Sequence, residues 1–258
     1  MCKEPLSFYD RSRSVEEPLY CHSALIVLMM NELFEKELRA LSRKVKGIEK
    51  AAYLVAILHD IGKVGIRRDR GGKSTFPFHE ALSAYMTYKW LKDDLLSLGI
   101  PEDLLGPTIY AVAMHHHAMR DAFDMEARNI GVFKIKGIAS SRLAELFPSL
   151  KETEGKEVMA NEVKNKVLDL AETLIASRLK REAFVLAGFV SVADSAAALL
   201  FRGKHYSDQE PIDSTAIPKK FIGRALEEKG VNLSEFLSRK VECDKVWKDA
   251  LNLIKPSF

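Results

Sequence analysis

The chain has 258 residues, of which 47% are hydrophobic and 29% charged, and its net charge is only +3. This length fits one large domain with a substantial core, and the apolar fraction excludes a disordered or fibrous chain. So small a net charge does not by itself indicate a nucleic-acid-binding protein. The longest uninterrupted apolar run, residues 51–58, is far shorter than the roughly 20 residues that span a bilayer, so we expect no membrane association.

Helical spacing of apolar residues runs through the first half of the chain. It continues after His22, and an alanine- and leucine-rich segment over 47–63 ends at glycines that favour a helix stop. We predict a further helix over about 78–98. Pro101 starts another, whose apolar face continues into three consecutive histidines at 115–117.

The second half of the chain is also predicted to be mainly helical. Residues 121–157 are mixed and charged, and we expect an insertion there with short helices or a small hairpin over 130–138. Helices are predicted over about 158–179 and 181–202. The tail over 211–258 is expected to form a loop and two amphipathic helices.

These elements predict an all-α fold, because the chain shows no repeat and no long alternating strand pattern. We expect residues 1–205 to form the main domain. Residues 206–258 would be a C-terminal helical extension packed on the same domain.

The three cysteines, Cys2, Cys21 and Cys243, are odd in number and scattered. This spacing predicts no disulfide framework, and Cys21 is expected to be a lone buried cysteine rather than a soft metal ligand. No charged segment followed by an apolar one opens the chain. We therefore expect a protein that is not exported and stays in the reducing cytoplasm.

The histidines are distributed unevenly. His115, His116 and His117 are consecutive, and three more lie alone in apolar helical segments, at His22, His59 and His79. An imidazole in such a place is costly unless it is hydrogen-bonded or binds a metal. A single buried histidine is usually structural, but six together favour a metal centre.

The pair His59-Asp60 closes the apolar run and is followed by Gly62-Lys63. On a helix, Lys63 can reach the space beside both residues, and Gly62 permits close approach of another helix or a ligand. Because the two side chains diverge by one helical step, one metal can take the imidazole nitrogen while the carboxylate bridges to a second. The alternative is an ordinary helix C-terminus with Gly65 as its stop, which leaves a buried Asp60 without a partner.

A second carboxylate, Asp194, lies in the late helix, close to the small residues 196–198. An aspartate on such a closely packing face should be paired or bind a metal, although a lone aspartate there is more often exposed. Six histidines and two carboxylates suit borderline transition metals, and carboxylates also tolerate magnesium. Two such ions a few ångströms apart can activate water and stabilise the leaving oxygen in phosphodiester cleavage.

The order of these motifs resembles the HD phosphohydrolase superfamily over about residues 5–202. More narrowly, the chain is similar to the stand-alone HD nuclease subunit of CRISPR type I interference systems. The motifs that carry this resemblance are Phe8-Tyr9-Asp10, His22, the His-Asp-x-Gly-Lys form at 59–63, Phe78-His79-Glu80-Ala81, His115-His116 and Val192-Ala193-Asp194. The resemblance implies an HD-domain helical bundle with a metal centre in its core, and makes residues 1–205 an HD nuclease domain.

The same resemblance implies two divalent ions, with Mn, Ni, Co or Fe expected and Mg as the alternative. One ion would be bound by His22, His59, Asp60 and Asp194, and the other by Asp60, His79, His115 and His116, so that Asp60 bridges them.

Two further residues follow from the resemblance. Lys63 would contact the scissile phosphate or its leaving group, which makes Asp60 and Lys63 the implied catalytic residues. The family often has two histidines followed by glycine, whereas here Ala118 follows three. His117 is therefore an alternative metal ligand in a shifted register.

A basic loop over 63–74 directly follows the His59-Asp60 pair. It carries Lys63, Arg67, Arg68, Arg70 and Lys73 against Asp69, a local charge of +4, and Phe76 and Phe78 come next. Basic side chains with nearby aromatic rings suit the backbone and bases of a single strand, which makes Arg67, Arg68, Arg70 and Lys73 candidate nucleic-acid-binding residues. A solvated loop followed by core aromatic residues is an equally good interpretation.

We therefore expect a metal-dependent nuclease that cleaves single-stranded DNA, or also RNA, in CRISPR interference, as an endonuclease or an exonuclease. The implied partners are a helicase subunit on a separate chain and an RNA-guided surveillance complex. One alternative is an HD phosphohydrolase acting on small or cyclic nucleotides. Another is a non-catalytic HD module that binds nucleic acid, against which the near-complete ligand set argues.

Overall fold

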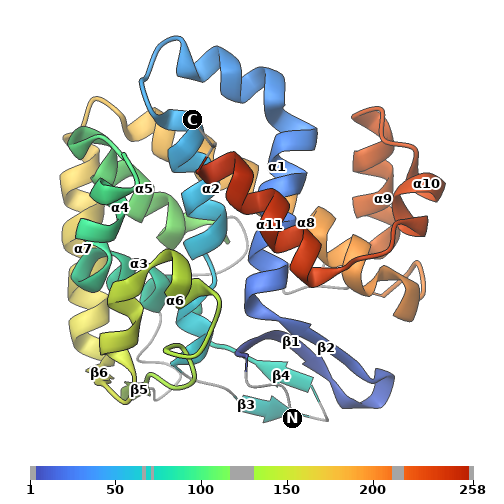
Figure 1. Cartoon of the computed structure of the whole chain (residues 1–258), viewed down its shortest axis with the longest axis horizontal. Coiled ribbons are helices and arrows are strands. Elements are labelled where there is room, and N and C mark those ends of the chain that lie inside the picture. The colour runs from blue at the N-terminus through green and yellow to red at the C-terminus, as the bar shows by residue number, and fades with distance from the viewer. Residues whose placement is uncertain (1–3, 66–67, 71–72, 117–130, 211–217, 256–258) are drawn as a thin grey trace.

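The computed structural model describes residues 4–65, 68–70, 73–116, 131–210 and 218–255, with the backbone alone at 68–70 and 73–75. Helices dominate these residues, which confirms the predicted all-α class. They are α1 Leu19–Ser42, α2 Ile48–Leu58, α3 His79–Trp90, α4 Lys92–Ser97, α5 Glu102–Met114, α6 Leu143–Leu146, α7 Ala160–Ile175, α8 Lys180–Arg202, α9 Lys219–Glu228, α10 Leu233–Ser238 and α11 Cys243–Ile254. Figure 1 shows α11 lying across α1, with α3, α4 and α7 on one side and α9 and α10 on the other.

Helix α2 lies at the centre of the bundle. Its residues 51–58 are all buried, so the longest apolar run of the sequence is a core helix that neighbours cover all round. Helix α2 contacts α1, α5 and α8, and α5 in turn contacts α3 and α7. The C-terminal ends of α2 and α5 are thereby held next to α3 and α8.

Three predicted helical segments have different bounds in the structure. The helix expected over 47–63 ends as α2 at Leu58, and a short 3₁₀ helix, Ile61–Val64, follows. The helix expected over 78–98 divides at Leu91, whose non-helical backbone (φ −112°, ψ 6°) separates α3 from α4. The C-terminal tail forms α9, α10 and α11 rather than two helices.

A small antiparallel sheet that the sequence did not predict covers one end of the bundle (Figure 1). Its strands, in spatial order, are β2 Val15–Pro18, β1 Leu6–Asp10, β4 Lys73–Thr75 and β3 Arg68–Arg70. Strands β1 and β2 form a hairpin directly before α1, and β4 joins it where Asp10 pairs with Lys73. The segment expected to be a basic loop therefore contains two paired strands.

The predicted insertion over 121–157 is described from residue 131 onward. Helix α6 and the 3₁₀ helix Pro148–Thr153 supply short helices there, but the predicted small hairpin over 130–138 is wrong. Instead, β5 Val132–Lys134 pairs with β6 Glu157–Met159, directly before α7. Strands of three residues carry too short a pattern to show their partners in the sequence.

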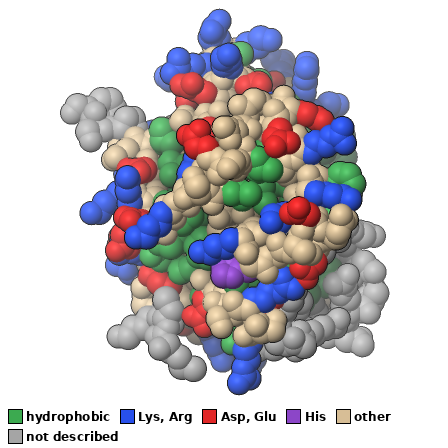
Figure 2. Space-filling view, turned by 90° about the vertical axis from the view of Figure 1, so that its right-hand side faces the viewer, with side chains coloured by type: hydrophobic (Ala, Val, Ile, Leu, Met, Phe, Trp, Pro, Cys, Tyr) green, Lys and Arg blue, Asp and Glu red, His purple; other side chains and the backbone are tan. Residues whose placement is uncertain are grey.

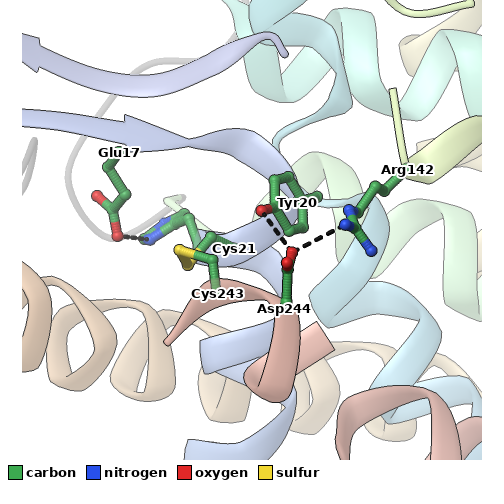
Figure 3. The surroundings of a disulfide bond; sticks show 7 residues. Glu17, Tyr20, Cys21, Arg142, Cys243 and Asp244 are labelled. Atoms are coloured by element: carbon green, nitrogen blue, oxygen red, sulfur yellow. Dashed lines mark hydrogen bonds and ion pairs between the residues drawn. A yellow bond between two sulfur atoms is a disulfide. The ribbon is translucent and has the colours of Figure 1, made fainter. Parts of the chain in front are cut away.

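A disulfide bond joins Cys21 of α1 to Cys243 of α11 (Figure 3). This finding corrects the expectation that the cysteines form no disulfide and that Cys21 is a lone buried cysteine. The two residues are 222 positions apart, and they meet because α11 packs against α1. The Tyr20 and Trp247 rings also meet edge to face beside the bond, with their centroids 5.9 Å apart. Tertiary packing of this kind leaves no trace in cysteine spacing.

Residues Lys180–His205, which include α8, are long and apolar enough to cross a membrane by length and composition alone. In the structure, 61% of the most apolar stretch is buried against other parts of the chain. This is the arrangement expected of a helix that packs in the core of a protein.

Candidate metal centre

Seven residues that the sequence singled out converge at the ends of the central helices. His22 comes from α1, His59 and Asp60 follow α2, His79 begins α3, His115 and His116 follow α5, and Asp194 lies in α8. All seven are buried, and none exposes more than 5% of its surface. Donor atoms of six of them form two groups, one of His22, His59 and Asp60 and one of Asp60, His79, His115 and His116, and within each group the atoms lie within 4.8 Å of one another.

Asp60 belongs to both groups because its two oxygens face different histidines. Asp60 Oδ2 lies 3.2 Å from His59 Nε2 and 3.6 Å from His22 Nε2. Asp60 Oδ1 lies 2.9 Å from His79 Nε2 and 3.9 Å from His115 Nε2. This is the arrangement of a carboxylate that can bridge two cations.

The helix end after Leu58 makes this arrangement, since Asp60 leaves the helical backbone region (φ −111°, ψ 3°). His59 and Asp60 therefore lie just beyond α2 rather than on a continuing helix. Gly62 permits the close approach that the sequence suggested, because a Cβ there would lie 2.2 Å from the carbonyl oxygen of His79. The turn thus packs directly on α3 and sets Asp60 against His79.

Three of the imidazoles are oriented by main-chain carbonyls of the preceding turn. In each, Nδ1 lies 2.7–2.8 Å from the carbonyl oxygen three residues earlier, as in the pairs His59–Ala56, His79–Phe76 and His115–Val112. The Nδ1 proton must point to the carbonyl, so the lone pair of Nε2 faces the centre. Ligating histidines are usually fixed in this way.

Several of these inward-facing atoms lack an ordinary partner. Among the described residues, Nε2 of His59, His79 and His115 and Oδ1 of Asp60 are buried with no hydrogen bond of normal geometry. Lone pairs that face one another in a buried site are costly unless a cation lies between them. Imidazole and carboxylate donors suit Zn, Cu, Fe, Ni and related divalent ions, so the residues present fit divalent metal.

Asp194 closes the centre on the side of α8. Its Oδ1 lies 2.9 Å from His22 Nε2, and its Oδ2 lies 3.8 Å from His116 Nε2. A lone aspartate on this helix would more often be exposed, but Asp194 is buried with the histidines. His117, the alternative ligand, lies outside the described residues.

Burial and the neighbouring charges set the protonation of the centre. Burial lowers the pKa of His115 to about 3, helped by His59, and burial lowers the pKa of His116. Burial alone would raise the pKa of Asp60, but His59, Lys63 and His79 hold it well below its usual range. Neutral imidazoles and an ionised carboxylate are the forms that bind a metal.

His22 differs from the other histidines in its partners. Burial alone would lower its pKa, but the carboxylates of Glu17 and Asp194 together raise the pKa to about 9. His22 Nδ1 lies 2.9 Å from Glu17 Oε1. Sequence reasoning missed Glu17, because it lies in an unremarkable charged pair five residues before His22.

Lys63 lies against the bridging carboxylate. Its Nζ pairs with Asp60 Oδ2 and donates a hydrogen bond of 3.1 Å to Ser7 Oγ. Ser7 Oγ in turn donates to Asp60 Oδ2 at 3.3 Å. The predicted reach of Lys63 is thus seen, with Asp60 as its partner. Ser7 was also missed, although it directly precedes the Phe8-Tyr9-Asp10 motif.

The candidate nucleic-acid-binding residues lie on the small sheet or outside the described residues. Arg68 and Arg70 are on β3 and Lys73 is on β4, next to the hairpin that carries Ser7. Arg67 falls outside the described residues. The backbone thus places the basic segment beside β1, one strand away from the start of α1.

Comparison with known proteins adds a family to this geometry. The family model of the HD domain matches residues 20–199, a stretch that contains all seven residues of the centre. No curated protein and no solved structure matches the chain. The match covers well over half of the chain and agrees with the buried histidine and aspartate groups. The chain therefore belongs to the HD domain family and is a metal-dependent phosphohydrolase of that family.

Proposed function

We propose that this chain is a nuclease that hydrolyses phosphodiester bonds of single-stranded DNA, and also of RNA, at a centre that holds two divalent metal ions. The observation that carries the proposal is the position of Asp60, whose two oxygens face two separate groups of imidazoles. Two ions held a few ångströms apart suit in-line displacement at a phosphate, since one serves the attacking oxygen and the other the leaving oxygen.

The ions, when bound, would supply an activated water and Lewis-acid stabilisation of phosphate oxygens. The chain's own residues would hold the ions and orient the groups around them. The carbonyls of α2 and α5 and of the segment before α3 fix the imidazole rings. Lys63 places a positive charge beside the shared carboxylate, with its side chain 12% exposed in an otherwise closed centre. From there it can contact a phosphate and offset the charge that develops on it.

The nucleic-acid part of the proposal rests on the basic segment. The structure removes base stacking on the neighbouring aromatic residues from this proposal. Phe76 and Phe78 expose only 9% and 6% of their surface, so they belong to the core and do not offer faces for base stacking. We propose that Arg68, Arg70 and Lys73, together with Arg67, guide the phosphate backbone alone. The face shown in Figure 2 carries interspersed basic and acidic side chains.

The motif resemblance further supports a role in CRISPR interference, with a helicase subunit on a separate chain and an RNA-guided surveillance complex as partners and with no membrane. We propose a cytoplasmic location on the same basis. The disulfide between Cys21 and Cys243 agrees with a cytoplasmic location only in a hyperthermophile, because such bonds are rare in other cytoplasmic proteins.

A second candidate function is hydrolysis of small or cyclic nucleotides. The deep burial of the seven residues favours it, since a closed centre suits a small substrate better than a long strand. Both functions use the same metal groups, so the substrate alone separates them.

Turnover assays on the metal-free full chain reloaded with Mn²⁺ would test the proposal. The substrates are labelled single-stranded DNA, double-stranded DNA, single-stranded RNA, and a panel of linear and cyclic nucleotides. We expect single-stranded DNA to be cleaved and the nucleotides to be left intact. Hydrolysis of a nucleotide with no cleavage of any strand would overturn the nuclease and favour the second candidate.

A further inference from the structure

We propose that Glu17 is a positioning residue that fixes the ring of His22, and that Arg202 holds Glu17 in place. Together they would set the metal affinity of the first position, formed by His22, His59, Asp60 and Asp194. This inference rests on the proposed two-metal centre. It holds that two residues outside the centre set the metal affinity of one of its two positions.

The Glu17 carboxylate is fully buried and uses both of its oxygens. Its Oε1 lies 2.9 Å from His22 Nδ1, beside the disulfide (Figure 3). Its Oε2 accepts a hydrogen bond of 2.6 Å from Arg202 Nε and forms an ion pair with Arg202 Nη2 at 2.5 Å. Arg202 is itself buried, so the pair is a dry, two-point contact. A planar guanidinium fixes a carboxylate more rigidly than a lysine would.

Three other rings at the centre are held by main-chain carbonyls, whereas the His22 ring is held by a side chain that a distant residue fixes in turn. His59, His79 and His115 donate to carbonyls three residues earlier in the chain. His22 of α1 instead uses a carboxylate from β2, which is held by an arginine at the end of α8. Helix α8 also supplies Asp194, so the His22 ring is held at Nδ1 by Glu17 and faces Asp194 at Nε2.

The two metal positions should therefore respond differently to loss of Glu17. A carboxylate behind a ligating imidazole fixes the ring and raises its basicity, and removal of such a partner weakens metal binding by about 10–100-fold. No described contact of Glu17 reaches the rings of His79 or His115, whose partners are main-chain carbonyls. Loss of the Glu17 side chain should therefore weaken the first position and spare the second.

A purely structural role is the rival explanation, because Arg202 also lies over the Phe8 ring, 4.2 Å from its centroid, and ties the hairpin to α8. A matched control is Asp10→Asn. Asp10 is another buried carboxylate of the same hairpin, and it accepts hydrogen bonds from Ser12 and Tyr206. If the hairpin only needs its buried carboxylates for stability, both variants should behave alike.

The experiment titrates the metal-free full chain with Mn²⁺ by calorimetry and follows Cd²⁺ binding by cadmium NMR, in which each bound ion gives its own signal. We expect two ions in the wild type. Glu17→Ala should weaken one position by about 10–100-fold and change the other by less than about threefold. Glu17→Gln keeps an oxygen that can accept the Nδ1 proton, so it should restore most of the lost affinity. Asp10→Asn should keep both ions even where its melting temperature falls.

Should Glu17→Ala fail to fold, Arg202→Lys tests the same point, because it keeps the charge and loses the two-point contact. It should weaken the first position alone. Equal weakening of both positions, or of neither, would overturn the role of Glu17 and leave the two-metal centre standing. The same loss of one ion in Asp10→Asn would also overturn it. A wild-type chain that binds a single ion would overturn the two-metal proposal itself.

Discussion

The two halves of the candidate metal centre are held in different ways. The rings of His79 and His115 are oriented by carbonyls within three residues of each histidine. In the other half, the ring of His22 is held by Glu17, five residues earlier on the hairpin, and Glu17 is in turn held by Arg202 at the distant end of α8. A ring held by a carbonyl three residues away is oriented as soon as its own helix end forms, whereas the orientation of the His22 ring also depends on how α8 packs against the hairpin.

Asp60 joins the two halves, and its replacement should have the largest effect. We expect Asp60→Asn to reduce cleavage by at least about 10³-fold, because both ions lose the carboxylate that they share. Metal content should fall at both positions, while circular dichroism should show an intact helical fold. A well-folded Asp60→Asn chain with full activity would contradict the bridging role.

Removal of both metal ions should abolish cleavage. The ions that restore cleavage should then show which kind of ligand surrounds them. After chelation, we expect Mn²⁺, Co²⁺ or Ni²⁺ to restore cleavage at least as well as Mg²⁺, because imidazole donors favour transition metals over magnesium. The measurement is the initial rate for each ion. Restoration by Mg²⁺ alone would mean that fewer histidines bind metal than proposed.

A replacement in one half should spare the other. His79→Asn removes an imidazole from the second group and leaves Glu17, His22 and Asp194 untouched, so we expect one bound ion in place of two and a fall in cleavage of about 10²-fold. Metal analysis on the purified variant, with wild-type chain as the control, checks the number. Loss of both ions would show that the halves do not form independently.

The basic segment of β3 and β4 should affect binding of a nucleic-acid strand without affecting either half of the metal centre. Neutralising Arg67, Arg68, Arg70 and Lys73 together should weaken binding of single-stranded DNA, and each lost phosphate contact should reduce the slope of log K against log salt by about 0.7. Metal content and hydrolysis of a small generic phosphodiester should remain. An unchanged salt slope would place the strand path elsewhere on the molecule.

The disulfide should have the smallest effect on activity. Cys243→Ser removes the bond between α11 and α1, and we expect a loss of about 2–5 kcal/mol in unfolding free energy. Below its melting temperature the variant should keep both ions, since Cys243 contributes no ligand. Thermal denaturation with and without reductant checks the stability change. A variant that melts like the wild type would show that the bond does not stabilise the fold.

What the sequence could predict follows the same division between local and distant contacts. The reach of Lys63 to Asp60 spans three residues, and helical spacing predicted it. The missing side chain of Gly62 indicated a close approach there, but not that the neighbour would be α3. The Cys21–Cys243 bond, the pairing of β5 with β6 and the contact of Ser7 with Lys63 join segments that no spacing relates. Motif order identified the seven buried residues, but it said nothing of Glu17 or Arg202, which do not face the ions.

Anomalous diffraction from crystals of the full chain loaded with Mn²⁺ would test the central claim most directly. We predict two manganese peaks on either side of the Asp60 carboxylate. One should be surrounded by His22, His59 and Asp194, and the other by His79, His115 and His116. A single peak, or two peaks of which neither touches Asp60, would contradict the shared-carboxylate centre.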